Sequence, residues 1–328
     1  MSRTLRRPLA VIAALAAMTL AGCASGPTSE SLPSGEATPA ATITVGVTPI
    51  ANAAPVYLGI DQGFFEEQNL EVTPTIIQAA AAAIPSLLND ELQFALVSPV
   101  PTITGASKGL PLNIVLANDH YGSGADFLDG AALIASANSG LSDVTELEGK
   151  TIAVVGLRSA PELAMRLTLE ANDVDPDSVD FVEIAYPDMV SALQSDRVDA
   201  AVVVTPFLTQ AKADGLALLS QPFVDGLGGE VGTTWVASST FLDEEPDVAV
   251  RFTTAMTKAV AYAAENPAEV RRIMATYTEM SEQALANALL PVYNSQITDA
   301  NIQFFADAMY AQGFIEDEFD TAGVLWKP

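Results

Sequence analysis

The chain is poor in cysteine, histidine and positive charge. Its 328 residues include one Cys, one His and 14 Lys plus Arg, against 41 Asp plus Glu, so the formal net charge is -27. A single Cys excludes a disulfide framework within one chain and any metal site built from several Cys ligands. The scarcity of cations argues against nucleic-acid binding, which depends on a basic face that displaces counterions from phosphates. We therefore expect no nucleic-acid partner.

A long apolar run occurs only near the N-terminus. Three Arg within the first seven residues precede an apolar stretch at 9–20, a pattern typical of a secretory signal. A helix of about 12 residues spans roughly 18 Å, which is too short for a hydrocarbon layer of roughly 30 Å. The run ends in Leu20-Ala21-Gly22-Cys23, which resembles the bacterial lipobox. We therefore predict a signal peptide over 1–22 and lipidation of Cys23, with an unmodified thiol as the alternative.

The segment after Cys23 has the composition of a linker. Residues 24–41 are Ser, Thr, Gly, Pro and Ala with two Glu and one Leu, and such a segment buries too little apolar surface to fold alone. We expect a flexible tether over 23–41. Acyl chains on Cys23 would hold the domain beyond it at the extracytoplasmic face of the bacterial cell membrane.

Beyond the tether, apolar β-branched runs alternate with helical stretches. This alternation predicts an α/β fold with mainly parallel sheets, since each parallel pairing needs a crossover. Helices are clearest near the end of the chain, where apolar residues recur on one helical face at 248–263 and again at 302–309 before Gly313. The predicted strands are Ile43–Val47, Val72–Ile77, Phe94–Val97, Asn113–Leu116, Leu133–Ala135, Ile152–Val155, Phe181–Ile184, Ala200–Val204, Ala217–Leu219 and Trp235–Ala237.

Proline or a capping hydroxyl follows many predicted strands. Ser98-Pro99 and Thr205-Pro206 are examples, and Ser159 with Glu162 has the spacing of a capping box. In a doubly wound sheet these junctions meet at the carboxyl ends of the strands, where ligands bind. Helix N-termini offer unpaired N–H donors there, which suit an anion or a polar acceptor.

Several ordered motifs resemble the substrate-binding proteins of bacterial ABC importers for nitrate, sulfonates, taurine and thiamine precursors. The opening stretch Pro55–Val72 contains the Gly-Phe-Phe turn of that family at residues 63–65. Further matches follow in order along the chain, although Asp90 and Gln93 replace the usual glycine and aspartate. These matches are Leu87–Phe94, Leu147–Val154, Val198–Ala201, Thr205-Pro206 and Asn266-Pro267.

The resemblance implies a type 2 periplasmic-binding fold with two α/β lobes, each a mostly parallel sheet flanked by helices. Two hinge crossings would join the lobes near 130–136 and 232–239. Lobe one would then comprise 42–136 plus 232–328, and lobe two 137–231. Solute would bind between the lobes, and the closed form would be presented to the transmembrane subunits of a permease. By this resemblance the chain is a monomeric binding protein, not an enzyme, and needs no cofactor.

We expect the ligand-binding residues at the ends of strands in both lobes. Arg158 could hold an anion through its planar guanidinium, or could simply pair with a surface acid. Ser98, Ser159 and Thr205 could act as helix caps, as ligand donors or as both. The predicted ligand-binding residues are Asn52, Ala80, Ser98 and Asn118 in lobe one, Arg158, Ser159, Tyr186 and Thr205 in lobe two, and Thr233 on the return segment.

The predicted solute is a small anion such as nitrate, a sulfonate or taurine. A neutral heteroaromatic, such as a thiamine pyrimidine precursor stacked on Tyr186 or Tyr121, is the alternative. An enzyme related to fungal pyrimidine synthesis is a weaker alternative, because that chemistry uses a Cys-rich motif that this chain lacks. We predict no metal site, because the Asp series at 173–177 continues with Ser178 where a calcium loop needs Gly. His120 is expected to be solvent-exposed or hydrogen-bonded rather than catalytic.

Overall fold

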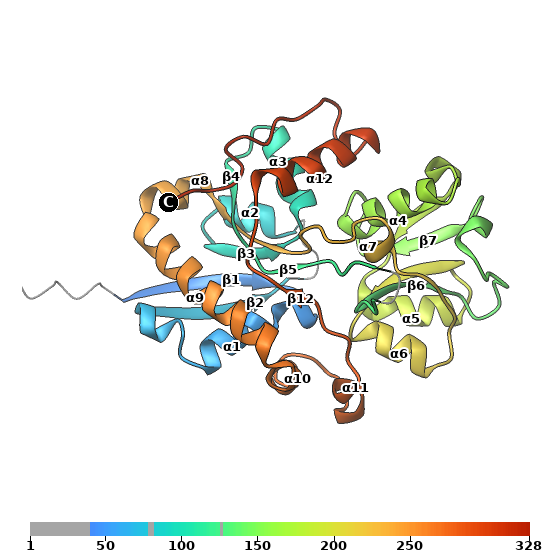
Figure 1. Ribbon diagram of the computed structural model, residues 1–328, viewed down its shortest axis with the longest axis horizontal. Coiled ribbons are helices and arrows are strands. Elements are labelled where there is room, and N and C mark those ends of the chain that lie inside the picture. The colour runs from blue at the N-terminus through green and yellow to red at the C-terminus, as the bar shows by residue number, and fades with distance from the viewer. Residues whose placement is uncertain (1–39, 78–81, 125–126) are drawn as a thin grey trace, which may run out of the picture. The chain divides into compact units, whose positions relative to one another are not determined.

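The structure of the chain is a computed structural model that describes residues 40–77, 82–124 and 127–328. The predicted signal peptide, Cys23 and Ala80 lie outside these residues. Two five-stranded sheets organise the part described, and Figure 1 shows them side by side with helices around each. We call the first sheet with its helices lobe one, and the second sheet with its helices lobe two.

The first sheet has the strand order β2-β1-β3-β11-β4. Strand β1 pairs in parallel with β2 and β3, whereas β11 runs antiparallel to both β3 and β4. Lobe one is therefore built from two distant parts of the sequence. Its strands are β1 (Ala41–Val47), β2 (Leu70–Ile76), β3 (Phe94–Val97), β4 (Leu112–Ala117) and β11 (Thr234–Ser238).

The second sheet has the order β10-β6-β9-β7-β8. Strand β7 is parallel to β8 and β9, and β6 is antiparallel to β9 and β10. Both sheets are thus mixed rather than mostly parallel, because each receives strands adjoining the segments that connect the lobes. The strands are β6 (Ala131–Ala135), β7 (Thr151–Val154), β8 (Asp180–Glu183), β9 (Ala200–Val204) and β10 (Leu218–Ser220).

The α/β architecture is confirmed, and each predicted strand is present within about two residues of its expected bounds. Two short strands were not predicted, β5 (Asp119–His120) and β12 (Val292–Tyr293), which pair antiparallel with each other. A two-residue strand carries no alternation that a sequence pattern could reveal.

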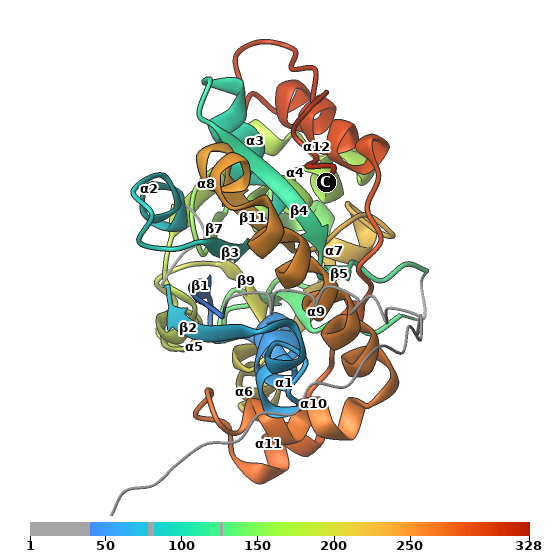
Figure 2. The same ribbon diagram turned by 90° about the vertical axis from the view of Figure 1, so that its left-hand side faces the viewer.

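The helices divide between the lobes in the same way as the strands (Figures 1 and 2). None of those in the described ranges is long and apolar enough to span a membrane. Lobe one carries α1 (Ala54–Asp61), α2 (Ala83–Leu88), α3 (Pro99–Ser107), α8 (Ser239–Glu244), α9 (Pro246–Glu265), α10 (Pro267–Met274), α11 (Glu282–Ala286) and α12 (Asp299–Ala311). Lobe two carries α4 (Ala160–Ala171), α5 (Tyr186–Gln194), α6 (Phe207–Ala213) and α7 (Pro222–Asp225).

Two crossing segments connect the sheets. The outgoing crossing, residues 118–130, runs from β4 to β6. The return crossing, residues 221–233, runs from β10 to β11 and includes α7, which packs on α4 of lobe two. The predicted crossings at 130–136 and 232–239 lie too far along the chain. Residues 131–135 already form β6 of the second sheet, and residues 234–238 already form β11 of the first.

The core of lobe one is aromatic. The Phe252 ring on α9 stacks on Phe94 of β3 with centroids 3.8 Å apart, and Trp235 of β11 meets it edge-on. The predicted apolar face of α9 is confirmed, because its residues from Val248 to Ala263 at helical spacing are buried. Helix α12 likewise buries Ile302, Phe305 and Met309 and ends just before Gly313, whose φ of 68° suits glycine.

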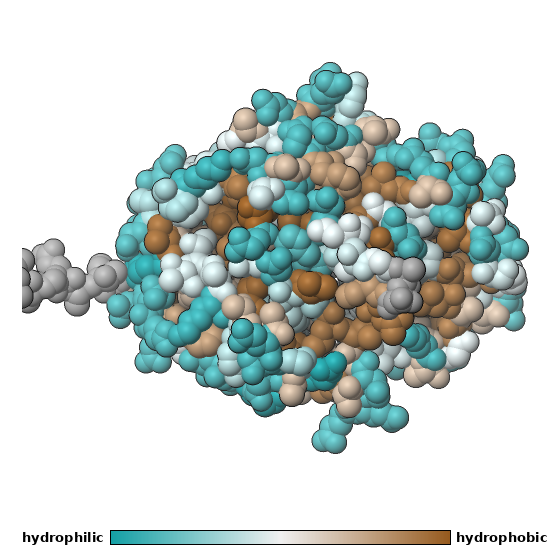
Figure 3. Space-filling model, in the orientation of Figure 1, coloured by the Kyte–Doolittle hydropathy of each residue, from teal (hydrophilic) through white to brown (hydrophobic). Residues whose placement is uncertain are grey.

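A second hydrophobic cluster continues from lobe one into lobe two. It includes Ile103 of α3 and Phe305 of α12 together with Leu163 of α4 and Phe223 of α7. The lobes are therefore in apolar contact on this side. On the face shown in Figure 3, hydrophilic residues cover most of lobe one, and apolar surface is more extensive toward lobe two.

Candidate functional site

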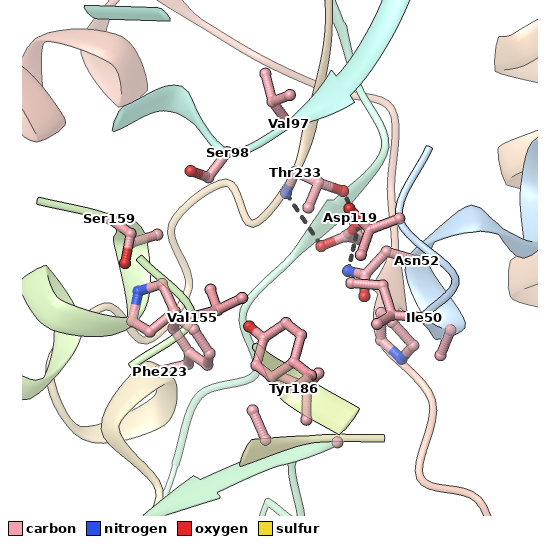
Figure 4. Close-up of a pocket in the computed structure, with 18 of the residues that line it drawn as sticks. Ile50, Asn52, Val97, Ser98, Asp119, Val155, Ser159, Tyr186, Phe223 and Thr233 are labelled. Atoms are coloured by element: carbon pink, nitrogen blue, oxygen red, sulfur yellow. Dashed lines mark hydrogen bonds between the residues drawn. The ribbon is translucent and has the colours of Figure 1, made fainter. Parts of the chain in front are cut away.

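A cavity of about 250 Å³ lies between the two sheets. It receives residues from the strand ends of both lobes and from both crossings, so neither lobe forms it alone (Figure 4). Lobe one contributes Thr48, Ile50, Asn52, Leu96, Val97 and Ser98 among others, and lobe two contributes Val155, Arg158, Ser159, Glu183, Tyr186 and Thr205. The crossings contribute Asp119, His120, Tyr121, Asp129, Gly130, Phe223 and Thr233.

Most of the predicted site residues meet at this cavity. The ones that line it are Asn52, Ser98, Arg158, Ser159, Tyr186, Thr205 and Thr233. All but Thr233 converge because the strands before them end at facing edges of the two sheets, and Thr233 joins them on the return crossing directly before β11. Their roles in binding stay predictions, and Ala80 lies outside the described residues.

Asn118 lies behind the cavity wall rather than in it. The residue is completely buried, and its amide donates to Asp119 Oδ2 at 2.8 Å and to the Asn52 carbonyl at 3.0 Å. Its Oδ1 accepts from Trp235 Nε1 at 3.3 Å. Asn118 therefore supports neighbouring residues of the wall, because its side-chain oxygen and nitrogen are already engaged.

Asp119 is the most heavily hydrogen-bonded acid of the site, and we did not predict it. Its carboxylate accepts from Asn52 Nδ2 at 2.9 Å, from the Thr233 N–H at 3.2 Å and from the Thr233 hydroxyl (Figure 4). It also accepts from Asn118 Nδ2. The side chain is only 2% exposed, and this burial raises the pKa of Asp119 against the lowering effect of those donors.

Asp129 is a second acid that the sequence did not single out. It ends the outgoing crossing beside β6, and its Oδ2 is buried with no hydrogen-bond partner in the part of the chain described. Burial raises the pKa of Asp129 to about 7, and the nearby charge of Asp119 adds to the effect. An acid two residues before the buried strand β6 is the signal that could have identified it.

Arg158 lines the cavity, but its guanidinium also reaches the outer edge of the cleft. The residue is exposed, with a left-handed φ of 53°, and its N–H donates to Glu162 Oε2 at 2.7 Å. Its Nη1 donates to the carbonyl of Phe314 in lobe one at 3.3 Å. This guanidinium therefore links the two lobes.

The capping roles predicted for the cavity hydroxyls are wrong for Ser98 and Ser159. Neither side chain caps its helix, although each residue stands at the N-cap position of α3 or α4. The predicted capping box of Ser159 and Glu162 does not form. Glu162 instead accepts from the Arg158 N–H and from Arg166 Nε. Ser159 Oγ is consequently buried without a partner among the described residues, and Thr205 Oγ1, before α6, is also buried without one.

Aromatic rings complete the wall. Tyr121 and Phe223 stack with centroids 4.5 Å apart and an interplanar angle of 4°. Figure 4 shows the Tyr186 ring between Val155 and Ile50. Burial raises the pKa of Tyr121 and of Tyr186, so both phenols stay neutral near pH 7 and can donate a hydrogen bond.

His120 is held by the backbone rather than by an acid. Its Nδ1 lies 3.2 Å from the Gly229 carbonyl and its Nε2 lies 2.8 Å from the Gln296 carbonyl. The hydrogen-bonded role expected for it is therefore confirmed. The described residues contain no group of three or more His, Cys, Asp or Glu that could hold a metal ion.

Known proteins share both sequence and fold with this chain. The family described as NMT1/THI5 like matches residues 50–270. A Bacillus subtilis (strain 168) protein whose name assigns it to aliphatic sulfonates is 24% identical over 285 residues, covering 83% of this chain and 82% of that protein. The taurine-binding periplasmic protein of Escherichia coli (strain K12) is 24% identical over 192 residues, covering 58% of this chain and 57% of that one.

Solved structures of known proteins share the fold of this chain. The alkanesulfonate-binding protein SsuA from Xanthomonas axonopodis pv. citri, bound to MOPS, superposes with a TM-score of 0.75 at 18% identity, covering 89% of this chain and 100% of that one. The periplasmic nitrate-binding protein NrtA from Synechocystis PCC 6803 gives a TM-score of 0.74 at 14% identity, with 87% and 85% covered. The two-lobed arrangement is therefore that of periplasmic binding proteins.

Proposed function

The chain belongs to the NMT1/THI5-like family, and on that premise we propose that it is the solute-binding component of an ABC import system. It captures a small molecule between its lobes and delivers it to the transmembrane subunits of a permease, without making or breaking bonds in the solute. The observation that carries this proposal is the cavity of about 250 Å³, whose wall is shared by both lobes and both crossings.

A wall divided between two lobes couples binding to closure. A solute that touches both lobes favours the closed arrangement over the open one, because only the closed arrangement makes all the contacts. The interlobe hydrogen bond from Arg158 Nη1 to the Phe314 carbonyl adds to the stability of the closed form. A permease that recognises the closed form then receives only loaded protein.

The names of the relatives favour a solute with an anionic or strongly accepting group. The N-terminal ends of α3 and α4, with Ser98 and Ser159 beside them, offer backbone and hydroxyl donors for such a group. A neutral heteroaromatic stacked on a tyrosine is the alternative, supported by Tyr121 and Tyr186 in the wall. Arg158 supports the anion less than expected, since its Nη1 already donates to Phe314.

We further propose that the protein acts outside the cytoplasm as a monomer held to the membrane through lipid on Cys23. The lipobox-like sequence and the linker composition of residues 24–41 support this placement. Mass spectrometry of membrane-extracted protein should find acyl chains on Cys23, and an unmodified thiol in the soluble fraction would refute the anchor.

A thermal-shift screen tests the binding function. The panel contains nitrate, ethanesulfonate, taurine and an aminopyrimidine, with enzymatic turnover of each followed in parallel. A binding protein gives a saturable rise in melting temperature with a solute that is recovered unchanged. The absence of any shift across solutes of all these classes, or conversion of one of them, would contradict the proposal.

A further inference from the structure

The charged groups around the cavity are mainly negative. The lining includes the carboxylates of Asp119, Asp129 and Glu183, whereas Arg158 is the one Lys or Arg among the described residues that line it. Nη1 of that Arg donates to the Phe314 carbonyl. A solute entering this cavity therefore meets more acidic than basic side chains.

Asp119 is buried and Asp129 is half-buried, and the two acids differ in the hydrogen bonds that the protein supplies to them. Asp119 receives hydrogen bonds from Asn52, Asn118 and both donors of Thr233. The backbone N–H groups of Gly130 and Ala131 lower the pKa of Asp129, but its Oδ2 is buried and receives no hydrogen bond from the described residues. A buried carboxylate oxygen without a hydrogen-bond partner is costly, and either a proton or a cation relieves that cost. Asp129 can therefore still accept a hydrogen bond from a solute, whereas the acceptor positions of Asp119 are largely occupied by donors of the protein.

The backbone around Asp129 is held in place. The Asp129 N–H donates to Gln221 Oε1 at 2.7 Å, and Gln221 Nε2 donates to the Phe127 carbonyl at 2.8 Å. The next residue, Gly130, accepts from the Thr205 N–H at 2.6 Å. Residues 127–130 of the outgoing crossing are thus held by Gln221 on the return crossing and by Thr205 directly after β9, and these hydrogen bonds position Asp129.

A second unpartnered group lies in the same part of the wall. Thr205 is only 2% exposed, lines the cavity, and its Oγ1 has no hydrogen-bond partner among the described residues. This oxygen lies 3.4 Å from where a Cβ on Gly130 would stand, so it is close to the residue that follows Asp129. A carboxylate and a hydroxyl with open acceptor positions together suit a group with several N–H donors.

Aromatic rings lie near these acceptors. The charge of Asp129 contributes to the raised pKa of Tyr121, whose ring stacks on Phe223, and Tyr186 also lines the cavity. Aromatic faces attract cations through the ring quadrupole and do not attract anions in this way. The aromatic rings and the carboxylates therefore both favour a positive charge in the solute.

Resting on the proposed function, we propose that the solute carries a protonated nitrogen, such as an ammonium or amidinium group, which binds Asp129 Oδ2 and Thr205 Oγ1. The solute is thus an organic cation or a zwitterion rather than a simple anion. Any anionic end of a zwitterion would lie toward Ser98 and Ser159, which line the same cavity at the N-termini of α3 and α4.

Matched pairs of probes test this proposal by thermal shift and calorimetric titration. Taurine is compared with ethanesulfonate, which lacks only the ammonium group, and benzylammonium is compared with benzyl alcohol. We expect the cationic member of at least one pair to bind the wild type at least tenfold more tightly than its partner. Asp129→Asn should reduce that preference to less than threefold, whereas Asp243→Asn, an exposed acid on α8, should leave it unchanged.

The outcomes separate this inference from the proposed function. Saturable binding of ethanesulfonate or nitrate with no gain from an ammonium group would overturn the cation site and leave the binding function standing. A preference for cations that survives in Asp129→Asn would also overturn it. If Asp129→Asn fails to fold, Thr205→Val provides the second variant, with a loss of cation preference expected and an unchanged preference contradicting the proposal.

Discussion

Asp119 on the outgoing crossing accepts two hydrogen bonds from Thr233 on the return crossing, one from its N–H and one from its hydroxyl. The two segments that connect the lobes are therefore joined to each other at the cavity wall. Asn52, which follows β1, donates to the same carboxylate and ties this junction to lobe one. This arrangement joins both crossings to lobe one beside the cavity.

The first prediction concerns the hydroxyl of that junction. Thr233→Val keeps the side-chain shape but removes a donor to a buried carboxylate, so it should lower the free energy of unfolding by about 1.5–3 kcal/mol. Thr254→Val, on the exposed face of α9, is the matched control and should change it by less than about 0.5 kcal/mol. Denaturant unfolding measures both, and equal values would show that the junction contributes little.

The second prediction concerns the space beside Asp119. A Cβ on Gly232 would stand 2.2 Å from Asp119 Oδ1, so Gly232→Ala must displace the carboxylate and should cost about 1–3 kcal/mol of stability. A Cβ on Gly156 would come no nearer than 4.0 Å to Glu183 Oε2, so Gly156→Ala serves as the matched control. Equal melting temperatures for the two variants would refute close packing at the junction.

The third prediction follows from the pKa of Asp129, which burial and Asp119 raise from 3.8 to about 7. Between these values the folded protein holds the proton more tightly than the unfolded chain does. The free energy of unfolding should therefore fall as pH rises from about 4 to about 7. Asp129→Asn removes this contribution, so its stability relative to the wild type should increase across that window in the absence of solute.

Denaturant unfolding at several pH values tests this expectation. Other acids titrate in both proteins. The difference in free energy of unfolding between the wild type and Asp129→Asn therefore reports the titration of the Asp129 carboxyl alone. A difference that stays constant from pH 4 to pH 8 would contradict a raised pKa at Asp129.

The fourth prediction concerns Arg158. If its bond to the Phe314 carbonyl stabilises closure, Arg158→Ala should weaken binding of cationic and anionic probes alike, by about three- to tenfold. Arg197→Ala, an exposed Arg of lobe two, is the control and should bind as the wild type does. Loss of anion binding alone would instead place the guanidinium in contact with the solute.

The strands and the main helices were predictable because their signals are local. Apolar β-branched runs identified strands such as β3 and β9, and the apolar face at 248–263 identified α9. The antiparallel place of β11 between β3 and β4 has no such local signal, because it depends on the return of the chain from lobe two. The resemblance to binding proteins supplied that return, with its boundaries displaced by several residues.

The site was predictable only where it coincides with the ends of strands. Ser98, Ser159 and Thr205 follow β3, β7 and β9, so the rule for parallel sheets locates them. Asp119 and Asp129 lie on a crossing, where burial between two lobes decides their chemistry. The direction of the Arg158 side chain depends on a left-handed backbone and on Phe314 from the other lobe, neither of which its sequence neighbours specify.

The most direct test of solute capture between the lobes is calorimetric titration with the panel member that gives the largest thermal shift. Val155 lines the cavity from the end of β7, and Val155→Trp should fill that space. We expect one saturable site per chain in the wild type and at least a hundredfold weaker binding in Val155→Trp with its melting transition retained. Saturable binding of equal strength in both proteins, or none to the wild type from any panel member, would contradict the account.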